Sequence, residues 1–154
     1  MTARNEDSAA PPAAALKEKT PLVVPRQFKR NSPDVRAMAP SADTGLWLLR
    51  YMCERIGIPS LAGFDVLDFG CGSRFAEAII THDIPLRTYH GIDVYKEMID
   101  FLAQNVSDQR LSFHHINAHN LKYNKEGEPL SPDTLLPVGD KKFDVICMFS
   151  VITH

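Results

Sequence analysis

Apolar positions along the chain repeat with two different periods, which predicts helices alternating with strands. The first clear helical period begins at Ser41, and Gly57 and Pro59 stop it. Its apolar positions are spaced three or four residues apart, as on one face of a helix: Leu46, Leu49, Cys53 and Ile56. Because Ser41 or Asp43 can cap the first turn through a side-chain oxygen, we expect a capped helix that ends before Gly57.

Four short apolar runs predict buried strands. They cover residues 65–69, 88–94, 111–117 and 143–149. Helical patterns over residues 74–81 and 96–104 separate the first three runs, and a loop-rich stretch over 119–142 precedes the fourth. The nearly continuous apolar character of the fourth run suits a parallel strand that is covered on both faces. Strands alternating with helices predict an α/β fold with a doubly wound, mostly parallel sheet.

Residues 1–40 differ in composition from the rest of the chain. Six of the eleven prolines lie there, together with a run of alanines. Such a composition buries too little apolar surface to offset the loss of chain entropy on folding. We therefore expect a disordered or loosely docked arm over residues 1–40, in which Leu22, Val23 and Val24 can touch a domain formed by residues 41–154.

Composition and charge narrow the class of protein. Apolar residues make up 44% of the chain and charged residues 23%, which is typical of a soluble globular protein. The formal net charge of −2 argues against a general nucleic-acid binder. No apolar run approaches the roughly 20 residues that span a bilayer, so we expect no membrane association. Three scattered cysteines without a C-x-x-C pair indicate reduced thiols in a cytoplasmic protein.

The first predicted strand ends in a glycine turn, Asp68-Phe69-Gly70-Cys71-Gly72. The two glycines let the backbone turn sharply and approach a ligand, and the helix that follows presents free N–H groups. A nicotinamide-dependent oxidoreductase would carry a third glycine where Phe75 stands, and Asp68 would repel its pyrophosphate. An ordinary strand-to-helix turn is the other alternative.

An acidic residue, Asp93, ends the second predicted strand, twenty-five positions after Asp68. A carboxylate at this position can accept both ribose hydroxyls of a bound nucleoside. Val94 would then offer an apolar edge to the adenine ring. Asp93 can equally cap the following helix, and the two roles are compatible. The glycine turn and this acid together predict a nucleoside site more specifically than either feature alone.

The Asp-x-Gly-x-Gly pattern resembles motif I of the class I (Rossmann-like) S-adenosylmethionine-dependent methyltransferases, and the resemblance covers the cofactor-binding part of that family over residues 43–154. It implies S-adenosyl-L-methionine as cofactor, with Asp68 serving the methionine ammonium group directly or through water. Asn117 stands where the family often has Asp, so its side-chain oxygen would contact the adenine amino group, and Ala118 leaves room for the ring. Arg74 departs from the pattern, because a third glycine is common at that position.

The phrase Phe-Ser-Val-Ile-Thr-His at residues 149–154 resembles the family's motif IV, where the backbone passes the methionine part of the cofactor. The resemblance therefore implies ten cofactor-binding residues: Asp68, Gly70, Cys71, Gly72, Asp93, Val94, Asn117, Ala118, Phe149 and Ser150. His154 is a candidate general base near the expected methyl group, with a structural histidine at a turn as the alternative.

The resemblance implies methyl transfer to a small-molecule acceptor whose identity stays open. No metal is expected, since His114 and His115 point to opposite faces of a strand and zinc needs at least three converging ligands. The family's sheet continues beyond a fourth strand, so we expect a domain truncated after strand 4, marginally stable and weakly active or inactive alone. A non-catalytic cofactor-binding or interaction module, whose open sheet edge accepts a partner strand, is the remaining alternative.

Overall fold

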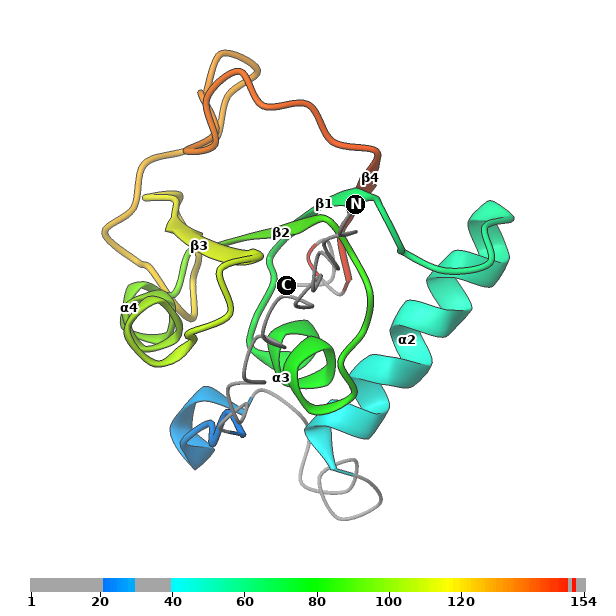
Figure 1. The fold of residues 1–154 in the computed structure, drawn as a ribbon. Helices are drawn as coiled ribbons and strands as arrows, with labels where there is room; N and C mark the ends of the chain where they lie inside the picture. The colour runs from blue at the N-terminus through cyan, green and yellow to red at the C-terminus, as the bar shows by residue number, and fades with distance from the viewer. Residues whose placement is uncertain (1–20, 30–39, 150, 152–154) are drawn as a thin grey trace, which may run out of the picture.

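The computed structural model describes residues 21–29, 40–149 and 151 (Figure 1). Four helical segments and four strands follow one another along these residues. Their order is η1 (Arg26–Phe28), α2 (Ser41–Ile56), β1 (Asp65–Phe69), α3 (Arg74–Thr81), β2 (Thr88–Asp93), α4 (Lys96–Asn105), β3 (Leu111–His115) and β4 (Val145–Cys147). The predicted bounds of β1 and α3 agree with the structure residue for residue.

The four strands form one sheet in the order β3-β2-β1-β4, and every neighbouring pair is parallel. The α/β class with a parallel sheet is thereby confirmed. The chain moves outward from β1 to β2 and β3, then crosses back to place β4 on the other side of β1. The carboxyl ends of β1 and β4 therefore flank the point where the strand order reverses, which is where ligands bind in open α/β sheets.

The two faces of the sheet are covered by different kinds of structure. Three long helices, α2, α3 and α4, pack with one face in a core that includes Val66, Tyr89 and Leu111. On the opposite face, Leu67 and Ile92 pack with residues of the connection between β3 and β4. Figure 1 shows this connection as the long orange segment that runs over the sheet, away from the helices. A doubly wound sheet is covered on both faces. Within the described residues, the face opposite the helices is covered by a loop.

The fourth strand is shorter and more open than the sequence pattern predicts. It spans Val145–Cys147, and Val145 and Cys147 are buried while Ile146 is 63% exposed. The expectation of a strand covered on both faces is therefore wrong for the described residues. Ile146 lies on the face that the loop covers only in part. The periodicity of a strand does not indicate how far a distant segment extends over it.

The start of α2 also differs from the expectation. Pro40 is its N-cap residue and no side chain caps it, because the hydroxyl of Ser41 donates to Glu77 instead. At the other end Gly57 adopts φ 75° and its N–H closes the last turn, as the sequence predicts. Ile56 is exposed, and Met52 is buried in its place.

Gly45 is the point of closest approach between α2 and α3. A Cβ atom at this position would lie 2.6 Å from the carbonyl oxygen of Arg74 and 2.8 Å from the Cβ of Ala78. Glycine therefore lets the two helix backbones approach more closely than any other residue allows. Arg74, which departs from the family pattern, is half-buried and packs its side-chain stem along the same contact.

The N-terminal segment over residues 21–29 packs onto the domain. Val24 and Phe28 are buried, at 4% and 6% exposed, and both belong to the core on the helical face. The ring of Phe28 lies 5.7 Å from that of Tyr95 and 5.3 Å from that of Phe101. The predicted boundary at residue 40 stays a prediction. No helix among the described residues is long and apolar enough to cross a membrane.

Candidate functional site

The glycine turn after β1 has the backbone conformation that its sequence predicts. Gly70 and Gly72 have φ values of 75° and 56°, which side chains rarely tolerate. The N–H groups of Gly70 and Cys71 both donate to the carbonyl oxygen of Ile92, at 2.7 and 3.0 Å. A Cβ at Gly70 would collide with Val151, whereas a Cβ at Gly72 would meet nothing within 4 Å. The backbone at Gly72 is therefore open to approach by a ligand.

Asp93 ties the turn after β2 to the glycine turn. Its two carboxylate oxygens accept from the backbone N–H groups of Gly72 and Tyr95, each at 2.9 Å. Only 2% of the residue is exposed. Tyr95 is the N-cap residue of α4 and caps it without its side chain, so Asp93 contributes to the start of α4 by holding the backbone of its cap. These two bonds fix the orientation of the carboxylate at the edge of the sheet.

Asp68 lies beneath the glycine turn on the helical face of the sheet, where it is also 2% exposed. The hydroxyl of Tyr89 donates to one carboxylate oxygen at 2.7 Å, and the Cys147 thiol lies 3.6 Å from the other. Burial raises the pKa of Asp68 to about 7, although both hydrogen bonds act in the opposite direction. Burial also raises the pKa of Tyr89 and that of Cys147. Side chains from three strands thus enclose this acid almost completely.

The end of β3 is closed by its own loop. The strand stops at His115, because the chain turns tightly there and the N–H of Ala118 donates to the carbonyl of Ile116 at 2.8 Å. Asn124 donates from its amide nitrogen to the side-chain oxygen of Asn117 at 3.0 Å and to the carbonyl of Ala118 at 3.1 Å. The Asn117 oxygen, predicted to contact adenine, therefore already accepts a hydrogen bond within the protein.

The remaining predicted site residues fall into three groups. Val94 packs against the cluster that contains the buried Ala118, which brings the ends of β2 and β3 together. Cys71 turns its side chain inward over Gly91 and so offers only its backbone to the turn. Phe149 packs edge-on against Phe75 at 5.2 Å. Ser150 and His154 lie outside the described residues.

A buried glutamate supports the glycine turn from below, and the sequence reasoning missed it. Glu77 accepts from the hydroxyls of Ser73 and Ser41, each at 2.9 Å and both on the same carboxylate oxygen. Its other oxygen lies 3.8 Å from the ammonium of Lys29. Ser73 directly follows Gly72 and stands one helical turn before Glu77, a spacing that could have indicated the contact.

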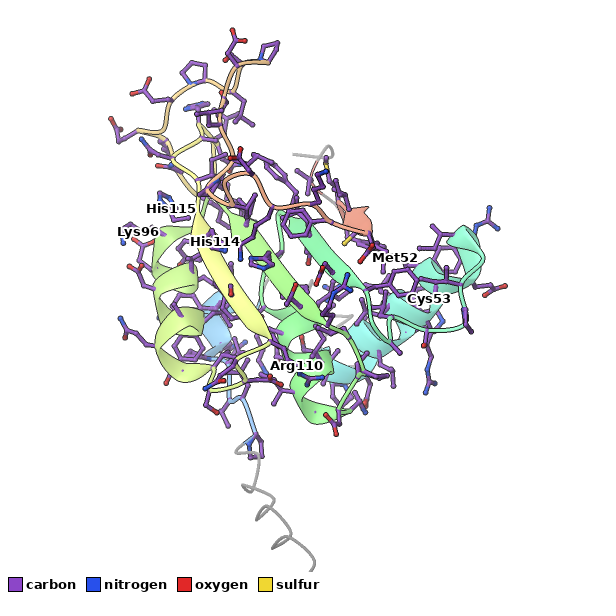
Figure 2. All side chains as sticks on the ribbon, turned by 45° about the horizontal axis from the view of Figure 1, so that its top comes forward. Met52, Cys53, Lys96, Arg110, His114 and His115 are labelled. Atoms are coloured by element: carbon purple, nitrogen blue, oxygen red, sulfur yellow. The ribbon has the colours of Figure 1, made fainter. Side chains whose placement is uncertain are left out.

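The histidines of β3 pair in a way that no local pattern predicts. His114 and His115 occupy the last two positions of β3 (Figure 2). The ring of His114 stacks on that of His90 from β2, with 3.2 Å between Nε2 and Nδ1. Lys141 lies 3.5 Å from the other nitrogen of His90. Among the described residues no three His, Cys, Asp or Glu side chains converge as metal ligands would.

A parallel sheet with a glycine turn at its switch point, tied to an acid at the next strand end, is an arrangement that nucleoside-binding α/β domains share. A family model described as a methyltransferase domain matches residues 67–154, more than half of the chain. The chain therefore belongs to the methyltransferase domain family, and the resemblance to class I S-adenosylmethionine-dependent enzymes is confirmed.

Among solved structures, the chain is similar to an S-adenosylmethionine dependent methyltransferase from Mesorhizobium loti. The two share 18% sequence identity with a TM-score of 0.34. The match covers 44% of this chain and 30% of that chain, so the matched region spans under a third of the longer protein.

Proposed function

We propose that this chain binds S-adenosylmethionine at the carboxyl edge of β1 and β2 and serves methyl transfer to a small-molecule acceptor. The observation that carries the proposal is the bond from the Gly72 N–H to the Asp93 carboxylate. It joins an open glycine backbone to an acid at the next strand end, at the switch point of a parallel sheet. In open α/β sheets, a glycine turn and an acid at the next strand end recur together where a nucleoside with a charged group is bound.

The residues present fit the chemical groups of that cofactor. Nothing lies within 4 Å of a Cβ built at Gly72, so a ligand can approach the turn closely. Asp93, held in place by its two backbone donors, would accept from the ribose hydroxyls. Asp68 would serve the ammonium group, directly or through water, and a nearby cation would favour its ionised form over the protonated one. Val94 would line the adenine ring.

The bound cofactor would supply a methyl group already activated on a sulfonium. The chain's own residues would bind and orient it, and alignment of the reacting atoms can supply roughly 7–11 kcal/mol of barrier reduction. The N-terminal N–H groups of α3, which begins at Arg74, would face the methionine carboxylate. The roles of Ser150 in binding and of His154 as a general base stay predictions.

Calorimetric titration of the full chain with S-adenosylhomocysteine tests the proposal. Wild type is expected to bind, and Asp93→Asn is expected to weaken binding at least about tenfold, since an amide keeps the shape but loses the charge and one acceptor. Asp100→Asn on α4 is the matched control and should bind like wild type, because Asp100 pairs with Lys96 at the exposed surface. Binding of NAD without S-adenosylhomocysteine would instead indicate an oxidoreductase.

Two further parts of the proposal concern the acceptor and the compartment. The net charge of −2 supports a small acceptor over a nucleic acid, and a gel-shift assay that detects tight RNA or DNA binding would contradict this. The described cysteines, Cys53, Cys71 and Cys147, are all buried thiols, which supports the reducing cytoplasm as the location. Binding of the cofactor without turnover over a broad acceptor screen would favour a non-catalytic module.

A further inference from the structure

Two adjacent residues of the N-terminal segment contact side chains that support the two turns of the site. Lys29 reaches toward the glycine turn, because its ammonium lies 3.8 Å from Glu77 and Glu77 holds the Ser73 hydroxyl at 2.9 Å. Ser73 is 5% exposed and immediately follows Gly72. The charge of Lys29 is thus separated from the glycine turn by one buried carboxylate and one buried hydroxyl.

Phe28 reaches the other turn. Its ring lies edge-on to Tyr95 at 5.7 Å with an interplanar angle of 72°, a favourable arrangement of two aromatic rings. The backbone N–H of Tyr95 donates to Asp93, so the position of Tyr95 bears directly on the orientation of that carboxylate. Phe28 is buried and also packs on Phe101, which fixes it against α4.

These contacts close a ring. Starting at Phe28 it passes through Tyr95, Asp93, Gly72, Ser73 and Glu77, and it returns to Lys29, the chain neighbour of Phe28. We propose that residues 24–29, here named the clasp, position both turns of the cofactor site, with Phe28 and Lys29 as positioning residues. The inference rests on the proposed function for its ligand, but its structural part can be tested without one.

If the clasp positions both turns, two thermodynamic consequences are expected. Its docking should hold the Gly72 and Tyr95 N–H groups on Asp93 in the absence of any ligand, because it braces the elements that carry both donors. By linkage, a cofactor that needs both turns in place should bind more tightly when the clasp is docked, and its binding should in turn protect the clasp from local opening.

The first experiment needs no ligand and uses the full chain. Hydrogen exchange of individual amides is followed by NMR in wild type, in Phe28→Leu with Lys29→Met, and in the control Arg26→Met. Arg26 lies on the same segment but is exposed. The double variant keeps apolar bulk and should fold. Its Gly72 and Tyr95 amides should exchange at least about fivefold faster. The Tyr89 amide, which bonds to Arg110 within the sheet, should keep its rate.

The second experiment titrates the same proteins with S-adenosylhomocysteine. The double variant should bind at least about fivefold more weakly, while Arg26→Met binds like wild type. In the wild type, saturating S-adenosylhomocysteine should slow exchange at the Phe28 and Lys29 amides, which donate to Pro25 and Arg26 within the clasp.

The outcomes separate the clasp from the proposed function. Unchanged exchange at Gly72 and Tyr95, or an equal rise at Tyr89, would overturn the positioning role, since the latter shows a general loss of stability. Unchanged affinity in the double variant would overturn the coupling to the ligand. Failure of the wild type to bind S-adenosylhomocysteine would refute the proposed function, and the exchange rates would still decide whether the clasp positions the two turns.

Discussion

Replacing Asp68 with asparagine should stabilise the protein at neutral pH while it weakens the proposed cofactor site. Asp68 is an almost fully buried acid, and its pKa of about 7 means that burial disfavours its ionisation. An asparagine has the same shape. Its oxygen can accept the Tyr89 hydroxyl, and its amide nitrogen can face the Cys147 sulfur, which is a weak acceptor.

The size and sign of the expected change in stability follow from the pKa of Asp68. The unfolded chain ionises this carboxyl above its ordinary pKa of 3.8, whereas the folded chain holds the proton until about pH 7. The folded state therefore binds more protons between these values, and the stability contribution of Asp68 falls as the pH rises through that window. Raising the pKa from 3.8 to about 7, at roughly 1.4 kcal/mol for a tenfold change in the ionisation constant, corresponds to a penalty of about 4 kcal/mol above pH 7. Asparagine does not ionise, so the variant does not incur this penalty.

The assay is urea unfolding of both proteins at several pH values from 4 to 8. The difference in unfolding free energy between Asp68→Asn and wild type should be smallest near pH 4 and should grow by about 2–4 kcal/mol toward pH 8. Asp65→Asn is a control whose stability at neutral pH should change in the opposite direction. Its hydrogen bond to Arg87 lowers the pKa of Asp65, so that variant should be less stable than wild type at neutral pH. An Asp68→Asn protein that is no more stable than wild type at pH 8 would refute the reasoning.

Two further predictions concern parts of the fold outside the site. Gly45→Ala should cost about 1–3 kcal/mol in urea unfolding, because its methyl group would force α2 away from the backbone at Arg74, and a neutral result would contradict the close helix contact. Burial and the charge of Lys141 lower the pKa of both His90 and His114, so the unfolded chain gains protons first and stability is lost as the pH falls below about 6.5. Lys141→Met should reduce the loss between pH 7.5 and 5.5, as measured by urea midpoints; an unchanged loss would contradict the role of that charge.

Sequence reasoning predicted the elements well because their signals are local. The bounds of β1 and α3 follow from a short apolar run and from helical spacing, and Gly57 ends α2 through its own backbone freedom. The glycine turn and Asp93 were found for the same reason, since each marks the end of a strand. The conformational preferences of these residues are intrinsic and depend little on the surrounding structure.

The contacts between distant segments could not be predicted in this way. The burial of Asp68 depends on the register that places Tyr89 on the same face of the sheet, and register is set by tertiary packing. The exposure of Ile146 depends on how far the connection before β4 extends over the sheet. The sequence indicates that Leu22, Val23 and Val24 can touch the domain. The role of Phe28, however, requires Tyr95, sixty-seven positions away, and no local pattern indicates that contact.

Buried acids connect these observations, because neither Asp68 nor Glu77 is explained by packing alone. A sequence under selection only for stability would replace Asp68 with an uncharged residue of similar shape, since the fold resists its ionisation. A buried carboxylate beneath an open glycine turn would suit the cation-binding role that we propose for it. Glu77 connects the glycine turn to more distant parts of the fold. Its partners Ser73, Ser41 and Lys29 link the turn to α2 and to the clasp. If Asp68→Asn gains stability and loses affinity for S-adenosylhomocysteine together, the acid is kept for binding and the rest of the network is there to hold the turn above it.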